Sequence, residues 1–208
     1  MSKISIDPIE IAPQEFLRAF YRDDNAEVYY RTFADKENDP FAGFKAHAPL
    51  KNYEDIAVQL RKQNELQRGV FFVVNGGGQK IEEVKASGRC QAQFMEIDDY
   101  PMDIQLELIN AFPIIPSIIV KTRKSLHTYW LVDNGDIFRF RNIQEKLIKV
   151  FGSDPKIKDE SRVMRIPTYY HCKADPVKVE VIHFNPELRY TQDQIEAALM
   201  DLSLDSSN

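Results

Sequence analysis

Two carboxylates stand at the end of an apolar stretch that reads as a strand, residues 94–99 with the sequence FMEIDD. Successive side chains of a strand point to opposite faces, so Glu96 and Asp98 point the same way and their apolar neighbours point the other way. Two adjacent carboxylates repel each other unless a cation lies between them. The pair therefore indicates a divalent metal site. The alternative is a solvated strand end, to which Asp99 adds a third carboxylate.

A second group combines Ser125 and His127, which share one face of the next expected strand pair. The basic side chains of Lys121, Arg123 and Lys124 precede them in the chain. Hydroxyl, imidazole and cationic groups on one surface can hold a phosphate-bearing ligand through charge-assisted hydrogen bonds. Taken alone, His127 also fits an ordinary, partly buried histidine.

A third group contains Arg162 and Arg165, which bracket a short apolar strand that ends at Pro167, with Lys173 close behind. Arginine can bind phosphate oxygens in a bidentate manner, so this spacing is typical of phosphate recognition. The alternative is that the two arginines pair with Asp159 and Glu160.

The charge of the chain is distributed unevenly. The net charge is −5, but residues 121–173 hold twelve Lys or Arg against six Asp or Glu, which leaves +6 there and −11 on the remainder. A positive segment of this kind attracts a phosphate-bearing ligand. The alternative is a set of charges scattered over a solvated face.

The elements expected around these groups mix helix and strand, which predicts an α/β fold. For residues 1–50 we expect an irregular extension that packs on the core through its aromatic side chains. Asn52 and Thr191 stand at capping positions of the first and last expected helix. Helices are expected over residues 52–68, 102–112, 138–151 and 191–202, and strands over 69–75, 94–99, 117–121, 126–132 and 177–184.

The sequence also argues against several classes of protein and site. No stretch approaches the roughly 18 apolar residues of a membrane span, and the N-terminus lacks the features of a secretory signal. Cys90 and Cys172 lack metal-ligand spacing, which argues against zinc and indicates free thiols in a reducing cytoplasm. A cytoplasmic protein without a membrane partner is expected.

Taken in order, the acidic pair, the Ser-x-His strand and the Arg-x-x-Arg-x-Pro strand resemble the primase-polymerase domains of the archaeo-eukaryotic primase superfamily. The resemblance is closest to the domain that opens many phage and mobile-element primase-helicase proteins. It implies an α+β core whose RRM-like antiparallel sheet carries the carboxylates, with an N-terminal αβ unit beside it. The expected division is an N-terminal extension over 1–50, a catalytic core over 51–190, and a C-terminal helix and tail over 191–208.

The same resemblance implies roles for individual residues. Glu96 and Asp98 correspond to two acidic metal ligands, and the third ligand is Asp154, with Asp159 as the alternative. His127 joins these carboxylates as a catalytic residue. Nucleotide-binding residues are implied at Lys121, Arg123, Ser125, His127, Arg162, Arg165 and Lys173.

The chain departs from the family pattern at three positions. Glu96 stands where Asp is commoner, Thr168 where glycine commonly follows the proline, and His171 where Asn is common. None of these changes removes a required charge, but Thr168 alters the turn that follows Pro167.

The activity that the resemblance implies is nucleotidyl transfer on a single-stranded DNA template, in the replication of a phage or mobile element. Carboxylate oxygens favour hard cations, so two Mg²⁺ or Mn²⁺ ions about 4 Å apart are implied, with nucleoside triphosphates as substrates. The sequence has no Gly-x-x-x-x-Gly-Lys-Ser/Thr loop, so a helicase partner would be fused elsewhere in a longer chain or act in trans.

Two other classes of protein share part of this pattern. A metal-dependent nuclease also clusters carboxylates with His and Lys, and it predicts DNA degradation without any need for nucleotides. An RRM-like nucleic-acid-binding module predicts that the acidic pair is dispensable. Such a module usually shows an aromatic and glycine signature on a central strand, which is not apparent in the sequence.

Overall fold

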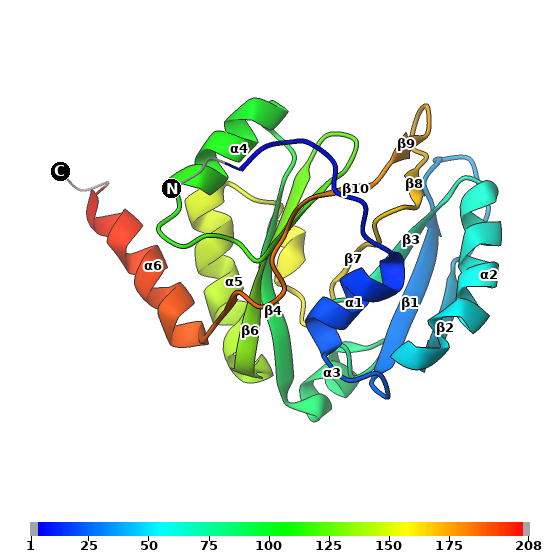
Figure 1. Ribbon diagram of the computed structural model, residues 1–208, viewed down its shortest axis with the longest axis horizontal. Helices are drawn as coiled ribbons and strands as arrows, with labels where there is room; N and C mark the ends of the chain where they lie inside the picture. The colour runs from blue at the N-terminus through cyan, green and yellow to red at the C-terminus, as the bar shows by residue number, and fades with distance from the viewer. Residues whose placement is uncertain (1–3, 206–208) are drawn as a thin grey trace.

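Two β-sheets form the framework of the computed structural model, which describes residues 4–205 (Figure 1). The first sheet has the strand order β10-β5-β6-β11, and β4 also pairs with β6. Its strands are β4 (Arg89–Ile97), β5 (Ile118–Lys121), β6 (Leu126–Asp136), β10 (Glu180–Phe184) and β11 (Arg189–Tyr190). The short β11–β6 pair is parallel, and all the other strand pairs of this sheet are antiparallel. The expected antiparallel sheet is therefore confirmed.

The second sheet is antiparallel throughout and has the order β2-β1-β3-β7. Its strands are β1 (Glu27–Ala34), β2 (Phe44–Pro49), β3 (Arg68–Val73) and β7 (Val163–Arg165). A separate hairpin pairs β8 (Tyr170–His171) with β9 (Val177–Lys178).

Helices cover these sheets, and the expected α/β character is confirmed. The helix expected over 52–68 ends at Glu65. The helix expected over 191–202 starts with a capping box. In it, the Thr191 N–H donates to the Gln194 side chain at 2.8 Å, and the Gln194 N–H donates to the Thr191 hydroxyl at 3.2 Å. Asn52 precedes its helix without a side-chain capping bond. Among the described residues the helices are α1 (Pro13–Tyr21), α2 (Tyr53–Glu65), α3 (Ile81–Ser87), α4 (Met102–Ala111), α5 (Ile137–Phe151) and α6 (Gln192–Asp205), with 3₁₀ turns at η1 (Leu50–Asn52) and η2 (Pro155–Lys158).

The expectation that residues 1–50 are irregular is wrong, because they contain α1, β1 and β2. Strand β1 lies between β2 and β3, inside the second sheet. Aromatic residues stand on both of its faces, with Tyr30 buried and Phe33 exposed, so no alternation of apolar and polar residues marks the strand in the sequence.

Helix α1 lies across the junction of the two sheets, and its buried face packs on both of them (Figure 1). The ring of Phe20 lies 5.0 Å from that of Phe72 on β3 and 5.1 Å from that of Tyr129 on β6, both edge to face. No strand of one sheet pairs with a strand of the other among the described residues, and this aromatic cluster is one of the contacts that link the sheets.

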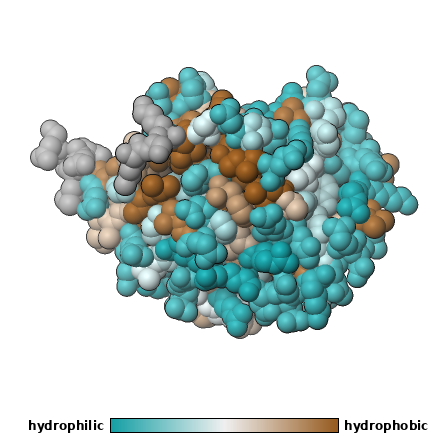
Figure 2. All heavy atoms as spheres, viewed as in Figure 1, coloured by the Kyte–Doolittle hydropathy of each residue, from teal (hydrophilic) through white to brown (hydrophobic). Residues whose placement is uncertain are grey.

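The other face of the first sheet is covered by α4 and α5 (Figure 1). The ring of Trp130 packs 5.0 Å from Phe112 and 6.0 Å from Phe151. On the side of the molecule seen in Figure 1, apolar residues gather near the middle and most of the remaining surface is hydrophilic (Figure 2). No helix in the described range 4–205 is long and apolar enough to cross a membrane.

The outer edge of β4 is satisfied by residues of α5 and the segment after it. The Gln144 side chain accepts a bond from the backbone N–H of Phe94 and donates one to its carbonyl. The Ser153 hydroxyl accepts from the Glu96 N–H at 3.0 Å and donates to the Glu96 carbonyl at 2.6 Å, to which the Asp154 N–H also donates at 3.0 Å. These bonds protect a strand edge and fix the backbone that carries Glu96.

Candidate active site

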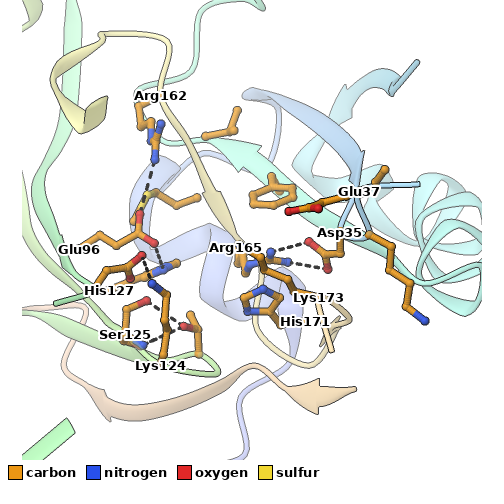
Figure 3. Close-up of a pocket in the computed structure, with 17 residues that line it drawn as sticks. Asp35, Glu37, Glu96, Lys124, Ser125, His127, Arg162, Arg165, His171 and Lys173 are labelled. Atoms are coloured by element: carbon orange, nitrogen blue, oxygen red, sulfur yellow. Dashed lines mark hydrogen bonds and ion pairs between the residues drawn. The ribbon is translucent and has the colours of Figure 1, made fainter. Parts of the chain in front are cut away.

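A pocket of about 400 Å³ opens between the ends of the two sheets (Figure 3). The first sheet contributes the end of β4 and the start of β6, and the second contributes β3, β7 and the residues that follow β1. The predicted site residues that line it are Glu96, Asp98, Ser125, His127, Arg162, Arg165 and Lys173. The predicted residues that do not line it are Lys121, Arg123, Asp154 and Asp159.

Glu96 and His127 face each other across the β4–β6 pair. They are directly opposite in the register, and Nε2 of His127 lies 3.3 Å from Oε1 of Glu96. The His127 side chain is buried, and its Nδ1 atom has no hydrogen-bond partner in the described part of the chain. The sequence predicts only the strand face on which each residue lies, and the β4–β6 register shows that the two residues are neighbours.

The charge state of Glu96 is set by its surroundings. Burial alone would raise the pKa of this carboxyl, but His127, followed by Arg162 and Arg165, lowers the pKa to about 2. Glu96 is therefore ionised at neutral pH, and the positive charges around it come from the chain itself.

Asp98 lies just beyond the end of β4 and also faces the pocket. Its Oδ2 atom pairs with Nζ of Lys124 at 2.9 Å, a contact that raises the pKa of Lys124. Its Oδ1 atom is buried and has no hydrogen-bond partner among residues 4–205. A buried carboxylate oxygen without a partner costs free energy, so it is suited to accept a ligand. Asp99, by contrast, is exposed outside the pocket.

Arg162 connects Glu96 to Asp154. A single guanidinium nitrogen, Nη2, lies 3.5 Å from Oε2 of Glu96 and 3.4 Å from Oδ2 of Asp154. Asp154 also caps η2 by accepting from the Lys156 N–H at 2.9 Å. In this arrangement no group of three or more Asp, Glu, His or Cys residues among those described could hold a metal ion.

Arg165 makes a bidentate ion pair with Asp35, with Nη2–Oδ1 at 2.6 Å and Nη1–Oδ2 at 3.2 Å. Both side chains are largely buried, and the guanidinium lies over the Phe71 ring at 4.6 Å from its centroid. Asp35 accepts a further bond from the Cys172 N–H at 2.8 Å. Sequence reasoning missed Asp35, because no signal marks it in a segment expected to be irregular.

The alternative, in which Arg162 and Arg165 pair with Asp159 and Glu160, is wrong. Both carboxylates instead pair with Arg141 on α5, at 3.5 Å from Asp159 and 2.9 Å from Glu160. Because these acidic residues face α5, the two arginines of the motif are directed toward the pocket.

The turn between β5 and β6 places Ser125 at the pocket floor. The Ser125 hydroxyl lies 2.9 Å from the Thr122 hydroxyl, and the Thr122 N–H donates to the Ser125 carbonyl at 2.9 Å. Lys121 instead pairs with Glu180 at 2.9 Å, and Arg123 donates to the carbonyl of Asp175.

His171 lines the opposite side of the pocket, beside Arg165 (Figure 3). Burial, assisted by the positive charge of Arg165, lowers the pKa of His171 to about 4. The ring is therefore neutral at pH 7, and it stands where the family pattern commonly has the neutral side chain of Asn.

The sequence of this chain matches a known family over the segment that contains the predicted site. Residues 79–199, more than half of the chain, match the profile of the RepB DNA-primase N-terminal domain. The chain belongs to this family. The carboxylate, Ser-x-His and Arg-x-x-Arg motifs of this RepB-family domain all lie inside the match, whereas Asp35 and Phe71 lie outside it.

Solved structures share the fold of the RepB-family domain. The archaeo-eukaryotic primase domain of the primase-polymerase from cyanophage S-2L has a TM-score of 0.73 and 23% identity, covering 88% of this chain and 94% of that chain. The primase RepB′ has a TM-score of 0.64 and 12% identity, covering 94% and 65%. The catalytic domain of RepB′ in complex with initiator DNA has a TM-score of 0.63 and 12% identity, covering 94% and 98%. A comparison with curated protein sequences gives no match.

These findings confirm the expected resemblance to the archaeo-eukaryotic primase superfamily and the expected fold. The RepB-family domain also shows how the chain accommodates its departure at position 168. Thr168 adopts a positive φ of 73°, a left-handed conformation that favours glycine, while its N–H donates to the Val179 carbonyl at 2.8 Å. The turn after Pro167 is thus formed with a residue poorly suited to it.

Proposed function

We propose that this primase domain catalyses nucleotidyl transfer, synthesising or extending primers on a single-stranded DNA template. The observation that carries the proposal is the pocket wall formed by Glu96 and Asp98, with the cationic Lys124 and Arg162 beside them. A nucleoside triphosphate requires positive charge for its phosphates, and transfer to a 3′-hydroxyl requires carboxylates that hold divalent cations. Both kinds of group meet in this pocket.

The donor set fits a hard divalent cation such as Mg²⁺ or Mn²⁺. Glu96 is ionised, and Asp98 has a buried oxygen without a partner among the described residues, so two carboxylate ligands are ready. When bound, such cations activate the attacking hydroxyl and neutralise the charge that develops on the transferred phosphoryl group.

Asp154 is the third ligand that we favour. Its backbone N–H donates to the Glu96 carbonyl, so it lies beside Glu96, and Arg162 already links the two carboxylates. Asp159 is about half exposed and pairs with Arg141, on the side toward α5.

The chain's own side chains would bind the triphosphate. Lys124, Arg162 and Lys173 line the pocket with positive charge, and His127 and Ser125 add polar groups to the same wall. Charge-assisted hydrogen bonds of this kind strengthen as negative charge develops in the transition state. Arg165, held by Asp35, contributes positive charge from the opposite sheet.

One assay tests the proposal. The purified chain is incubated with single-stranded DNA, labelled ribo- or deoxyribonucleotides and Mg²⁺ or Mn²⁺, and the products are sized on a gel. We expect longer labelled products from wild type, none from Glu96→Gln or Asp98→Asn, and near wild-type amounts from Asp99→Asn, whose carboxylate lies outside the pocket.

Other outcomes would contradict the proposal. Shortened DNA in the absence of nucleotides would indicate a nuclease, and DNA binding that survives without any incorporation would indicate a binding module. We further propose that this activity serves the replication of a phage or mobile element, because the fold is shared with the primase-polymerase domain of cyanophage S-2L, and that a helicase is fused to the chain or acts in trans.

A further inference from the structure

One face of the second sheet carries aromatic side chains that the core does not use. Residues directly opposite in an antiparallel pair lie on the same face, and the register places Phe33 opposite Gly69 and Phe71 opposite Arg165. Since Gly69 and Phe71 are two residues apart on β3, all four lie on one face. The rings of Phe33 and Phe71 lie 5.3 Å apart, edge to face.

This face is open, whereas the opposite face of the same strands is buried. Tyr30, Val70 and Phe72 fill the core on the buried side. On the open side, Phe33 keeps 39% of its surface exposed, and Phe71 lines the pocket. The two rings form an aromatic pair at the end of β1 beside the charged pocket, and aromatic rings in such a place are suited to stack on bases.

Glycine at position 69 keeps the floor between these side chains flat. A Cβ atom there would come within 2.5 Å of Nη1 of Arg165 and 2.7 Å of the Phe71 ring. The absence of a side chain thus allows Arg165 to reach across β3 to Asp35 while lying over Phe71.

Positive charge borders the aromatic pair. Lys36 and Lys173 are exposed residues at the pocket, and neither forms an ion pair with another residue of the described segment. Glu37 is the nearby acidic residue of the lining, while the charge of Asp35 is balanced by Arg165. Aromatic rings combined with cations that track a backbone are how proteins bind single-stranded nucleic acids.

We propose that Phe33, Phe71, Lys36 and Lys173, here called the Phe33 surface, bind unpaired bases of the single-stranded DNA template beside the pocket. The inference rests on the proposed function, because a template base must pair with the nucleotide held in the pocket. Glu96, His127 and Lys124 lie on one side of the pocket, and Asp35 and Glu37 lie on the other (Figure 3). A nucleotide whose phosphates contact the first side extends its base toward Phe71, and the template base next to it lies over Phe33.

The test measures binding of a fluorescently labelled single-stranded oligodeoxynucleotide by anisotropy, without nucleotides or metal ions. Base stacking on an aromatic side chain is worth about 1–3 kcal/mol, so Phe33→Ala should weaken binding by about tenfold. Phe33→Trp should retain binding. Phe138→Ala is the matched control, because Phe138 is 71% exposed on α5, away from the pocket lining.

The outcomes separate this proposal from the proposed function. Four outcomes would each overturn the Phe33 surface. Phe33→Ala could bind the oligodeoxynucleotide with wild-type affinity, or Phe138→Ala could lose as much affinity as Phe33→Ala. The wild-type protein could fail to bind single-stranded DNA, or Phe33→Ala could lose as much affinity for duplex DNA as for single-stranded DNA. Normal binding by Phe33→Ala combined with inactive Glu96→Gln would leave the catalytic proposal standing. If DNA binding depends on Phe33 but the wild-type protein incorporates no nucleotides, the Phe33 surface is supported and the proposed catalytic function is contradicted.

Discussion

His127 lies directly opposite Glu96 in the β4–β6 register, with Nε2 of the imidazole 3.3 Å from Oε1 of the carboxylate. Arg162 approaches the other oxygen of Glu96 at 3.5 Å, and Lys124 neutralises Asp98. The repulsion expected between Glu96 and Asp98 is therefore offset by three cationic or polar side chains of the chain itself.

We expect Glu96→Gln to destabilise the fold in a manner that depends on pH. The folded-state pKa of Glu96, about 2, is below the ordinary value of 4.5, so the carboxylate stabilises the native state fully above pH 4.5 and loses this contribution as pH falls through 2. The stability lost at pH 7 should approach about 3 kcal/mol. Urea unfolding of metal-free protein between pH 2 and 7 measures it. Glu187→Gln, which changes an 85% exposed side chain, should be nearly neutral, and a pH-independent loss in Glu96→Gln would contradict the charge argument.

Asp154→Asn should abolish nucleotide incorporation, and Asp159→Asn should be milder. Asp154 lies beside Glu96 through its N–H and through Arg162, whereas Asp159 is a half-exposed partner of Arg141. Initial rates of primer extension measure the difference. If Asp159→Asn were the inactive variant, the third metal ligand would be Asp159 and not Asp154.

His127→Ala should weaken nucleotide use more than DNA binding, because it removes a group from the wall that we propose holds the phosphates. Titration of nucleotide at a fixed template concentration separates kcat from KM, and anisotropy measures DNA binding. His47→Ala is the control, since His47 is 65% exposed, pairs with Glu27 and lies outside the pocket. Unchanged kcat and KM in His127→Ala would remove this residue from the site.

Asp35→Asn and Arg165→Ala should each destabilise the fold by about 3–5 kcal/mol, because each leaves a buried charge without its partner. In nucleotide use, Arg165→Lys should fall between wild type and Ala, since lysine keeps the charge but loses the bidentate geometry. Chemical unfolding and nucleotide titration measure the two effects. Arg18→Ala breaks an exposed pair with Asp24 and should cost less than about 1 kcal/mol. A loss of that small size in Asp35→Asn would be inconsistent with a buried pair.

Thr168→Gly should stabilise the protein by about 0.5–1 kcal/mol. The left-handed φ of 73° is unfavourable for a residue with a Cβ atom, and the relief exceeds the extra flexibility that glycine brings to the unfolded chain. Thermal unfolding measures the change. Thr168→Ala keeps the Cβ atom and should show no such gain, so an equal gain in both variants would point to the loss of the threonine side chain rather than to backbone strain.

The sequence by itself determined the local features of the site. Alternation along a strand places Glu96 and Asp98 on one face, and a turn signal followed by an apolar strand positions Ser125 and His127. Helices α2, α4, α5 and α6 were also predictable, because apolar periodicity, capping residues and glycine at helix ends act over a few neighbouring residues, whereas α1 and α3 were not predicted. Gly152, which ends α5 with a φ of 61°, is an example.

Only the tertiary structure decided which of these groups meet. Asp35 directly follows β1 and Arg165 ends β7, on opposite sides of β3, so their pairing depends on the order of strands in the second sheet. The exposed face that carries Phe33 and Phe71 likewise exists only when β1 pairs with β3. Side-chain alternation is a short-range property, whereas strand order and register are set by burial of the whole core, and no local pattern records them.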